Sequence, residues 1–194
     1  MKPTDIAQPD YFHKVVDCQW ACPAHTPVPE YIRLIAQGRY DDAYLVNWKS
    51  NVFPGILGRT CDRPCEPACR RVRVEEGSPE HRKAHAKPEA VAICRLKRAA
   101  ADYKGDIRPH LPKPAAKGNG KRVALVGAGP ASLTVARDLA PHGYQCVVFD
   151  GDPKAGGMMR TQIPKFRLPD RVIDEECGYV LDLGVEFRAG TRVD

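Results

Sequence analysis

Six of the eight cysteines lie in the first half of the 194-residue chain, in a pattern suited to binding an iron–sulfur cluster. Three of them form a C-x3-C-x3-C run that is interleaved with Pro64 and Pro67. These prolines favour an irregular, bent backbone that can wrap around a bound group. Each iron of a cluster takes one soft, anionic thiolate. We therefore predict metal ligands at Cys18, Cys22, Cys61, Cys65, Cys69 and Cys94.

Zinc binding and simple burial are the two alternative interpretations of the cysteines. Structural zinc sites usually pair their ligands as C-x2-C, a spacing that does not occur in this sequence. Burial suits Cys146, which lies in an apolar strand-like run, and Cys177, which lies in a helix-like segment, so neither is assigned to the site. His13 and His25 are near the cysteines in sequence, and hydrogen bonding or packing is the preferred interpretation of both.

A second pattern, which begins at Val123, predicts a dinucleotide-binding turn for a flavin or a nicotinamide. Gly127 and Gly129 follow a short apolar run, and their missing side chains let backbone amides approach a pyrophosphate at the start of a helix. Ser132 replaces the usual third glycine and is small enough for close packing. Asp150 follows Gly127 by 23 residues, near the spacing of a carboxylate that binds a ribose hydroxyl. The predicted cofactor contacts of this turn are Gly127, Gly129, Pro130, Ala131, Ser132 and Asp150.

The elements expected around the cysteines are helices joined by loops. Prolines open a helix between Pro27 and Gly38, and residues 40–48 form a second helix. Pro88 opens a third helix, which carries Cys94 and runs to about residue 103. A small helical domain buries little apolar surface, so ligation of a cluster would supply stability that its core cannot.

Strands and helices alternate in the second half of the chain. Strands are predicted at residues 123–126, 145–149 and 185–187, with helices at about 130–139 and 169–181. Because this alternation is typical of a parallel sheet, the apolar run that ends at residue 126 is expected to be a buried strand.

The proline- and glycine-rich stretch at residues 109–120 is the expected linker, because it can form neither a helix interior nor a central strand. The fold class is therefore α+β with two domains. A small all-α iron–sulfur domain is expected at residues 1–108. A partial Rossmann-like α/β domain is expected at residues 121–194.

The composition narrows the classes of partner. No apolar run is long enough to cross a bilayer, and the N-terminus lacks the apolar stretch of a secretory signal, so we expect a cytoplasmic protein without membrane insertion. The net charge of +6 is modest, and the arginine clusters at residues 70–73 and 95–98 adjoin cysteines instead of exposed aromatic residues. We interpret these basic residues as counter-charges of the iron–sulfur cluster. We expect no binding of nucleic acid.

These motifs resemble the glutamate synthase small subunit family, which includes the matching region of dihydropyrimidine dehydrogenase. The resemblance to the cluster-binding domain rests on residues 22–32, 58–70 and 88–102. The resemblance to the adjoining flavin domain rests on residues 127–131, 150, 156–158 and 163–169.

The resemblance implies an electron-transfer pathway. In the family, NAD(P)H reduces FAD, and the flavin passes electrons singly through [4Fe-4S] clusters to a partner oxidoreductase subunit or domain. The implied cofactors are FAD and one or two clusters, in a hetero-oligomer. Gly156, Gly157 and Met158 would lie beside the flavin, and no catalytic residue is assigned. Family members continue into an NAD(P)H-binding domain, so NAD(P)H is expected to bind outside this chain, which we interpret as a fragment or as one subunit.

The resemblance also implies how the cysteines divide. Cys22, Cys61 and Cys65 would serve one cluster, and Cys94 could be its fourth ligand because it lies one helical turn before Lys97, where relatives hold a non-cysteine ligand. Two further thiols, Cys18 and Cys69, would serve a second cluster that lacks two expected thiolates, or they are idle thiols beside the first. The alternative function is a non-catalytic electron-transfer or assembly module without a working flavin site.

Overall fold

The computed structural model describes residues 16–73 and 89–193, without the side chain of Arg73, and the chain divides into two compact units after Gly105. His13 and Pro88, which the sequence singled out, lie outside the described residues. No helix in the described ranges is both long enough and apolar enough to pass through a lipid bilayer.

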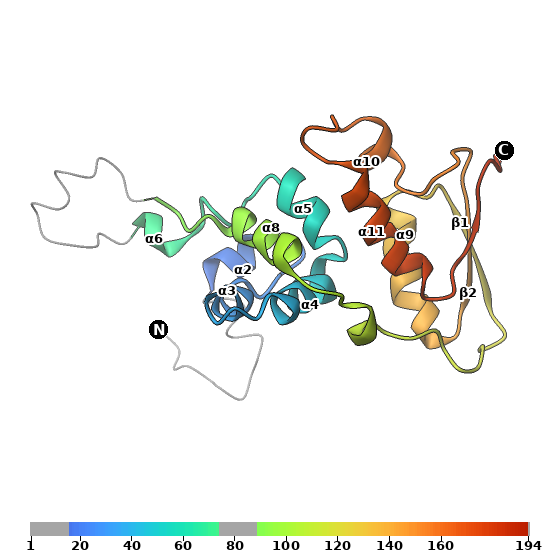
Figure 1. Ribbon diagram of the computed structural model, residues 1–194, viewed down its shortest axis with the longest axis horizontal. Helices are drawn as coiled ribbons and strands as arrows, with labels where there is room; N and C mark the ends of the chain where they lie inside the picture. The colour runs from blue at the N-terminus through green and yellow to red at the C-terminus, as the bar shows by residue number, and fades with distance from the viewer. Residues whose placement is uncertain (1–15, 74–88, 194) are drawn as a thin grey trace, which may run out of the picture. The chain divides into compact units, whose positions relative to one another are not determined.

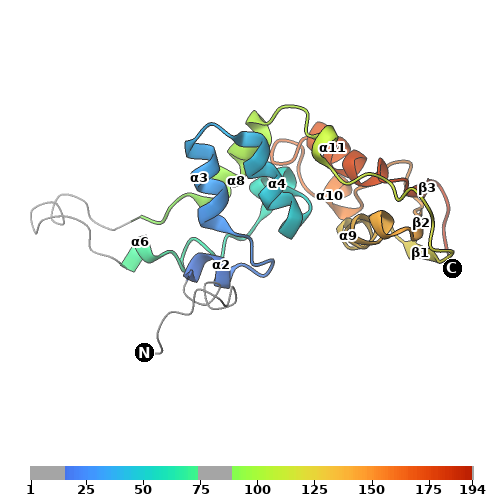
Figure 2. The same cartoon turned by 90° about the horizontal axis from the view of Figure 1, so that it is seen from below.

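The described part of the first unit consists of helices packed around α8 (Figure 1). α8 contacts α3, α4 and α5, and α3 also packs on α4, as the turned view shows (Figure 2). Tyr31 and Ile93 are among the buried side chains of this core, together with the thiol of Cys65. The helices are α2 (Asp17–Ala21), α3 (Val28–Ala36), α4 (Tyr40–Asn51), α5 (Pro54–Thr60), α6 (Arg70–Arg73) and α8 (Ile93–Tyr103).

α5 and α8 make the closest approach between helices that bears on the cysteines. A Cβ atom on Gly58 of α5 would lie 2.8 Å from the Cα atom of Arg98, so this crossing leaves no room for a side chain. One residue later, Arg59 donates a hydrogen bond of 2.6 Å to Asp102 of α8, and its guanidinium side chain is only 3% exposed. These two contacts fix the end of α5, where Cys61 lies, against α8.

The expected helices of the first unit are found, with one error of position, and three short helices, α2, α5 and α6, were not predicted. α3 agrees with the prediction, and α4 runs three residues further than residue 48. The prediction of a helix from Pro88 was wrong over residues 89–92, because α8 begins only at Ile93. Glu66 provides the physical reason, since its carboxylate accepts the N–H of Cys94 at 3.1 Å and satisfies a donor of the first turn there.

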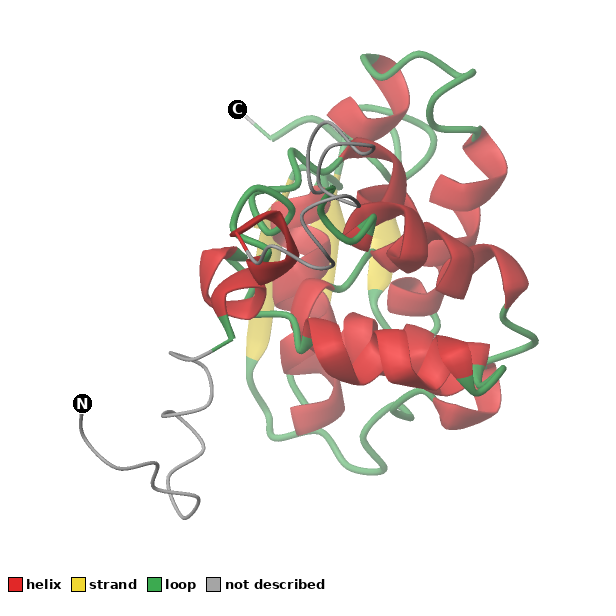
Figure 3. Ribbon diagram, turned by 90° about the vertical axis from the view of Figure 1, so that its left-hand side faces the viewer, coloured by secondary structure: helices red, strands yellow, loops and turns green. Residues whose placement is uncertain are grey.

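The second unit contains a parallel sheet of three strands in the order β1-β2-β3 (Figure 3). Residue 126 pairs with 149, and residue 149 with 188. α9 packs on β1 and β2, and α11 packs on α9 from the same side of the strands (Figures 1 and 2). The elements are η1 (Arg108–His110), β1 (Arg122–Val126), α9 (Pro130–Leu139), η2 (Ala140–His142), β2 (Gln145–Phe149), α10 (Met158–Thr161), α11 (Asp170–Leu181) and β3 (Glu186–Arg188).

The three strands are found where they were predicted. The first strand, β1, was expected to be buried, and this expectation was wrong. Only Leu125 of β1 is buried, and Val126 is 64% exposed, because β1 is an edge strand of the described sheet. The central strand β2 carries the buried positions, among them Cys146. Cys177 is buried as well, on the inner face of α11, so both of these cysteines are core residues as predicted.

Candidate functional site

The cysteines of the first unit are brought together from separate segments. Cys22 and Cys61 directly follow α2 and α5 and have extended backbones, whereas Cys94 is the second residue of α8. Cys65 lies in the turn after Cys61. Cys65 and Cys94 are buried, the other two are half-buried, and all four are free thiols.

Cys22 and Cys61 are close enough to Cys65 to affect its pKa, and Cys61 and Cys94 affect each other's pKa. Burial raises the pKa of Cys65 to about 11, and the neighbouring Cys22 and Cys61 add to the shift. Cys94 is within hydrogen-bonding reach of Cys61, and its Sγ also lies 3.3 Å from the carbonyl oxygen of Leu57. Since a thiol carries one proton, it can donate to only one of these acceptors at a time.

The Cys61–Cys94 pair is polarised so that Cys61 is the better thiolate. Donation from Cys94 lowers the pKa of Cys61, which the N–H of Arg63 and the charge of Lys97 lower further, against the effect of burial. The same hydrogen bond, together with burial, raises the pKa of Cys94. Arg63 can direct its N–H at the Cys61 Sγ, at 3.3 Å, in the left-handed conformation (φ +61°) that it adopts.

Polar groups on neighbouring helices surround the four thiols. Lys97, on the buried stripe of α8, is only 6% exposed, and its charge lowers the pKa of Cys61, opposing the upward shifts at Cys65 and Cys94. The buried hydroxyl of Tyr31 donates to the carbonyl oxygen of Ile93 at 3.1 Å and so ties α3 to the start of α8. Burial and the nearby thiols raise the pKa of this phenol.

The loop after Cys22 is anchored by Thr26, which is buried. Its hydroxyl oxygen accepts hydrogen bonds from Ser50 at 3.0 Å and from Asn51 at 3.4 Å, both on α4. The thiol of Cys22 also reaches this oxygen, at 3.6 Å. His25 is exposed, with its ring 5.4 Å from that of Trp20. Packing is therefore the role that the structure supports for His25, as expected.

Cys18 and Cys69 form a second group of thiols. Burial raises the pKa of Cys18, and the proximity of Cys69 raises it further. Their sequence neighbours, Asp17 and Arg70, form an ion pair of 3.0 Å that holds the two segments together. This pair of thiols could ligate a metal centre, but two sulfurs alone do not complete the four ligands of a cubane cluster.

The spacing of the thiols is relevant to the kind of group that they could hold. Within residues 16–73 and 89–193, no three cysteine, histidine or acidic side chains are close enough together to bind a single metal ion. A four-iron cluster makes a different demand, because each thiolate binds a different iron at a corner of a cube. Neighbouring thiols that raise the pKa of Cys65, as Cys22 and Cys61 do, suit such a core, because its iron would neutralise thiolates that otherwise repel. The donor set therefore fits a cluster.

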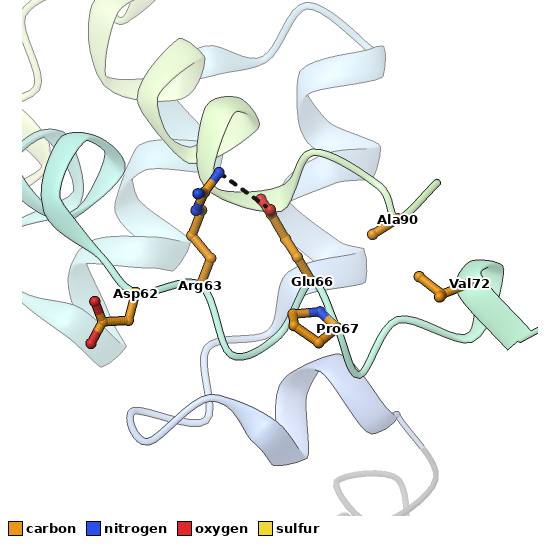
Figure 4. Close-up of a pocket in the computed structure, with 6 residues that line it drawn as sticks. All are labelled: Asp62, Arg63, Glu66, Pro67, Val72 and Ala90. Atoms are coloured by element: carbon orange, nitrogen blue, oxygen red, sulfur yellow. Dashed lines mark ion pairs between the residues drawn. The ribbon is translucent and has the colours of Figure 1, made fainter. Parts of the chain in front are cut away.

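A pocket of about 250 Å³ lies on the outer side of the cysteine triplet. Figure 4 shows Arg63 and Glu66 pointing toward one another across it, with a nitrogen–oxygen distance of 3.6 Å. Its lining residues are Asp62, Arg63, Glu66, Pro67, Val72 and Ala90, and no cysteine is among them. The pocket is therefore distinct from the place where the thiols meet.

In the second unit, the predicted cofactor residues meet where β1 and β2 end. Gly127 donates to the carbonyl oxygen of Phe149 at 2.8 Å, and the N–H of Ala128 donates to Asp150 Oδ2 at 2.6 Å. The other oxygen of Asp150 accepts the N–H of Asp152 at 2.8 Å. Asp150 thus shapes the glycine turn directly, and its binding of a ribose hydroxyl stays a prediction.

The two glycine turns pack against each other. Gly157 adopts φ +49°, and a Cβ atom on it would lie 3.0 Å from the Cα atom of Gly129, at the start of α9. Gly156 adopts φ +131° and donates its N–H to Ala128 at 2.8 Å. Ser132 reaches the carbonyl oxygen of Val126 at 3.4 Å. Pro130 and Ala131 form the first turn of α9, and Met158 is 65% exposed beside the turns.

This arrangement can bind a dinucleotide by backbone groups. The N-terminus of α9 carries a positive partial charge, which favours a pyrophosphate, and the missing side chains of the glycines permit close approach. The exposed apolar side chains of Val126 and Met158 offer contact area for an aromatic ring.

Three residues that matter to the thiol site were not identified from the sequence. Glu66 positions Cys94, Thr26 anchors the Cys22 loop, and Tyr31 joins α3 to α8. Glu66 could have been noticed in the sequence, because it is an acidic residue within the cysteine triplet and a cluster does not need a carboxylate ligand there. Thr26 and Tyr31 carried no comparable signal.

Each of the two units matches a known protein family. Residues 11–108, about half of the chain, match the family described as dihydropyrimidine dehydrogenase domain II, 4Fe-4S cluster. Residues 125–191 match the NAD(P)-binding Rossmann-like domain. The first description names an iron–sulfur cluster, which favours this interpretation of the cysteines over zinc.

Curated relatives resemble the chain along most of its length. The NADP(+)-dependent formate dehydrogenase subunit beta of Moorella thermoacetica is 36% identical over 91% of the chain. The NADPH-Fe(3+) oxidoreductase subunit beta of Geobacter sulfurreducens is 34% identical over 98% of it. The glutamate synthase [NADPH] small chain of Escherichia coli is 33% identical over 91%.

The chain spans only 26%, 27% and 35% of these three relatives, respectively. The shared region thus includes the cysteine-bearing unit and the glycine turns, and it agrees with the resemblance seen in the sequence motifs. The chain belongs to the dihydropyrimidine dehydrogenase domain II 4Fe-4S family, and its second unit is a Rossmann-like region that matches the family described by NAD(P) binding.

Proposed function

We propose that the chain is the electron-transfer part of an FAD- and iron–sulfur-dependent NAD(P)H oxidoreductase. Cys22, Cys61, Cys65 and Cys94 hold one [4Fe-4S] cluster, which when bound takes up and releases single electrons. The observation that carries this proposal is the convergence of these thiols beside the buried Lys97, in a unit that matches a 4Fe-4S family.

Each chain residue has a distinct role in this proposal. Cys61 is the thiolate that forms most readily, because Cys94, Arg63 and Lys97 all favour its charged form. Cys94 ligates after losing the proton that it shares with Cys61. Cys18 and Cys69 are ligands of a second cluster, which two further donors must complete.

The second unit binds FAD on its glycine turns. Gly127, Gly129 and the first turn of α9 receive the pyrophosphate, and Gly156, Gly157 and Met158 lie beside the ring system. FAD when bound can exchange electrons in pairs or singly, which links a nicotinamide donor to a one-electron carrier. The family that matches the second unit is described by NAD(P) binding and not by FAD. Our choice of FAD therefore rests on the resemblance of the turn at Gly156, Gly157 and Met158 to the corresponding loop of flavin domains.

The electron acceptor is a partner oxidoreductase subunit, and NAD(P)H binds outside this chain. Three relatives support this part of the proposal, because their names describe NADP(H)-linked enzymes and call each protein a beta subunit or a small chain. We place the assembly in the cytoplasm, where a reducing environment keeps the thiols available for ligation.

The test is reconstitution of the chain under anaerobic conditions with iron, sulfide and FAD, followed by removal of unbound cofactor. We expect FAD to remain bound and to be released by heat. We expect illumination with an added sacrificial electron donor to reduce that FAD and to produce the electron paramagnetic resonance signal of a reduced cluster. NADPH in place of light should give little signal, because its site lies outside the chain.

Two results would change the proposal. If FAD washes out while iron and sulfide remain, the alternative function is correct and the chain is a cluster module without a flavin site. If FAD remains but illumination never reduces a cluster, the two sites do not form one electron-transfer pathway.

A further inference from the structure

Lys97 is a buried cation that lies one helical turn after Cys94 on α8. It lies on the inner stripe of α8 with Ile93, Cys94 and Ala100, and only 6% of it is exposed. Within the described residues, no carboxylate forms an ion pair with it. Burying an ammonium group is costly unless opposite charge compensates it. Among the described residues, the groups whose pKa the charge of Lys97 lowers are the thiols of Cys61, Cys65 and Cys94.

The neighbouring segments supply these sulfurs and two carboxylates, Asp62 beside Cys61 and Glu66 near Cys65 and Cys94. Cys61 comes from the end of α5, Cys65 from the triplet turn, and Cys94 from one helical turn earlier on α8, and the charge of Lys97 acts on all three. Glu66 contributes negative charge near Cys65 and Cys94, but its carboxylate is engaged by the N–H of Cys94 at 3.1 Å and by Arg63 at 3.6 Å.

We propose that the ammonium group of Lys97 is the counter-charge of the cluster held by these thiols and raises its reduction potential. This inference rests on the proposed function. Adding one electron to the cluster makes the site more negative by one charge. A fixed cation in a site shielded from water stabilises that added charge more strongly than an exposed cation does, because the effective dielectric constant is lower.

Arg95 provides a matched comparison on the same helix. It is exposed, and the structure gives it no ion pair within the described residues. Lys97→Met and Arg95→Met each remove one positive charge from α8, but only the first removes it from among the sulfurs. Lys97→Arg retains the charge and changes the shape, which separates charge from packing.

The experiment is an anaerobic redox titration of the reconstituted full chain, followed by the electron paramagnetic resonance signal of the reduced cluster. For Lys97→Met, we expect the ratio of reduced to oxidised cluster at a fixed potential to fall about tenfold, which is about 59 mV for one electron. For Arg95→Met and Lys97→Arg, we expect a midpoint potential that differs from that of the wild-type chain by less than about a third of this shift.

Several outcomes decide the inference. It is supported if only Lys97→Met lowers the potential, or if Lys97→Met loses iron while Lys97→Arg retains it. It is overturned if Lys97→Met has the wild-type potential, if Lys97→Arg shifts as far as Lys97→Met, or if both lose iron, because packing would then be the role of Lys97. Wild-type protein that holds no iron would instead overturn the cluster assignment in the proposed function.

Discussion

The thiol site and the glycine turns are built by opposite means. The thiol site depends on side chains that come from four segments between Cys22 and Cys94, and on polar residues that tune their charge. The glycine turns lie between Gly127 and Gly157 and depend on side chains that are missing. The first site is thus sensitive to charge and to long-range packing, whereas the second is sensitive to side-chain atoms added at Gly156 and Gly157.

This difference has a consequence for how each site fails. Loss of one ligand or one charge should alter the bound metal centre, even where the helices still pack. A methyl group at a glycine should disturb the backbone itself, because the left-handed conformation and the close contacts leave no alternative position.

The largest effect is expected from the double variant Cys61→Ser, Cys65→Ser. Replacing both thiolates by hydroxyls removes two soft ligands of one cluster, so the reconstituted chain should lose about four iron, the content of that cluster. Iron analysis measures this. Cys146→Ala, which changes a buried thiol of the second unit, is the control and should retain the wild-type iron content. Equal iron in the double variant would show that these cysteines are not ligands.

Asp102→Asn should destabilise the first unit by about 3 kcal/mol, because it removes the carboxylate from the buried guanidinium of Arg59. Chemical denaturation measures the free energy of unfolding. Asp42→Asn is the control, since its ion pair with Arg39 is exposed on both sides, and it should cost less than about 1 kcal/mol. Equal losses in the two variants would rule out a special role for the α5–α8 ion pair.

The Asp102 pair also predicts a pH dependence. Burial alone would raise the pKa of the Asp102 carboxyl, but hydrogen bonds from Arg59 and Arg98 outweigh it and leave the pKa lowered. The stabilisation is therefore complete above the unfolded pKa of about 4 and is lost as pH falls through the lower folded value. Asp102→Asn should remove this part of the acid sensitivity.

Gly157→Ala should destabilise the second unit by about 2 kcal/mol, because alanine is strained in the left-handed region and its methyl group would press on Gly129. Binding of FAD should weaken in parallel. Gly151→Ala, where a Cβ atom meets nothing within 4 Å, is the matched control. A Gly157→Ala protein as stable as Gly151→Ala would contradict the close packing of the two glycine turns.

The smallest effect is expected at Gly178, in the interior of α11. A Cβ atom there meets nothing within 4 Å, so Gly178→Ala should stabilise the second unit by about 0.5–1 kcal/mol through the lower entropy of the unfolded chain. Thermal denaturation should show a rise in melting temperature. A fall would mean that this position is more tightly packed than the structure indicates.

The strands and the two longer helices of the second unit could be predicted from its sequence, whereas the short helix α10 was not. α9 and β2 agree with the predicted ranges, because glycines, a helix-opening proline and apolar periodicity are all local signals. The exposure of Val126 could not be predicted, since burial of a strand depends on what lies beside it in the sheet.

The first unit was less predictable because distant residues decide its local structure. α5 contains two glycines and a proline within seven residues, and it is helical where α8 packs against it. The start of α8 depends on Glu66, which is 28 positions from Cys94. The spacing of the cysteines predicted which residue types are relevant to the site, but the burial of Lys97 among them emerged only from the packing of α8.

The central claim is that thiols of the first unit hold a four-iron cluster, and stoichiometry tests it most directly. Iron, acid-labile sulfide and zinc should be measured per chain after anaerobic reconstitution in the presence of all three. We predict about four iron and about four sulfide for each cluster held, with little zinc. One zinc ion per chain without sulfide would contradict the account.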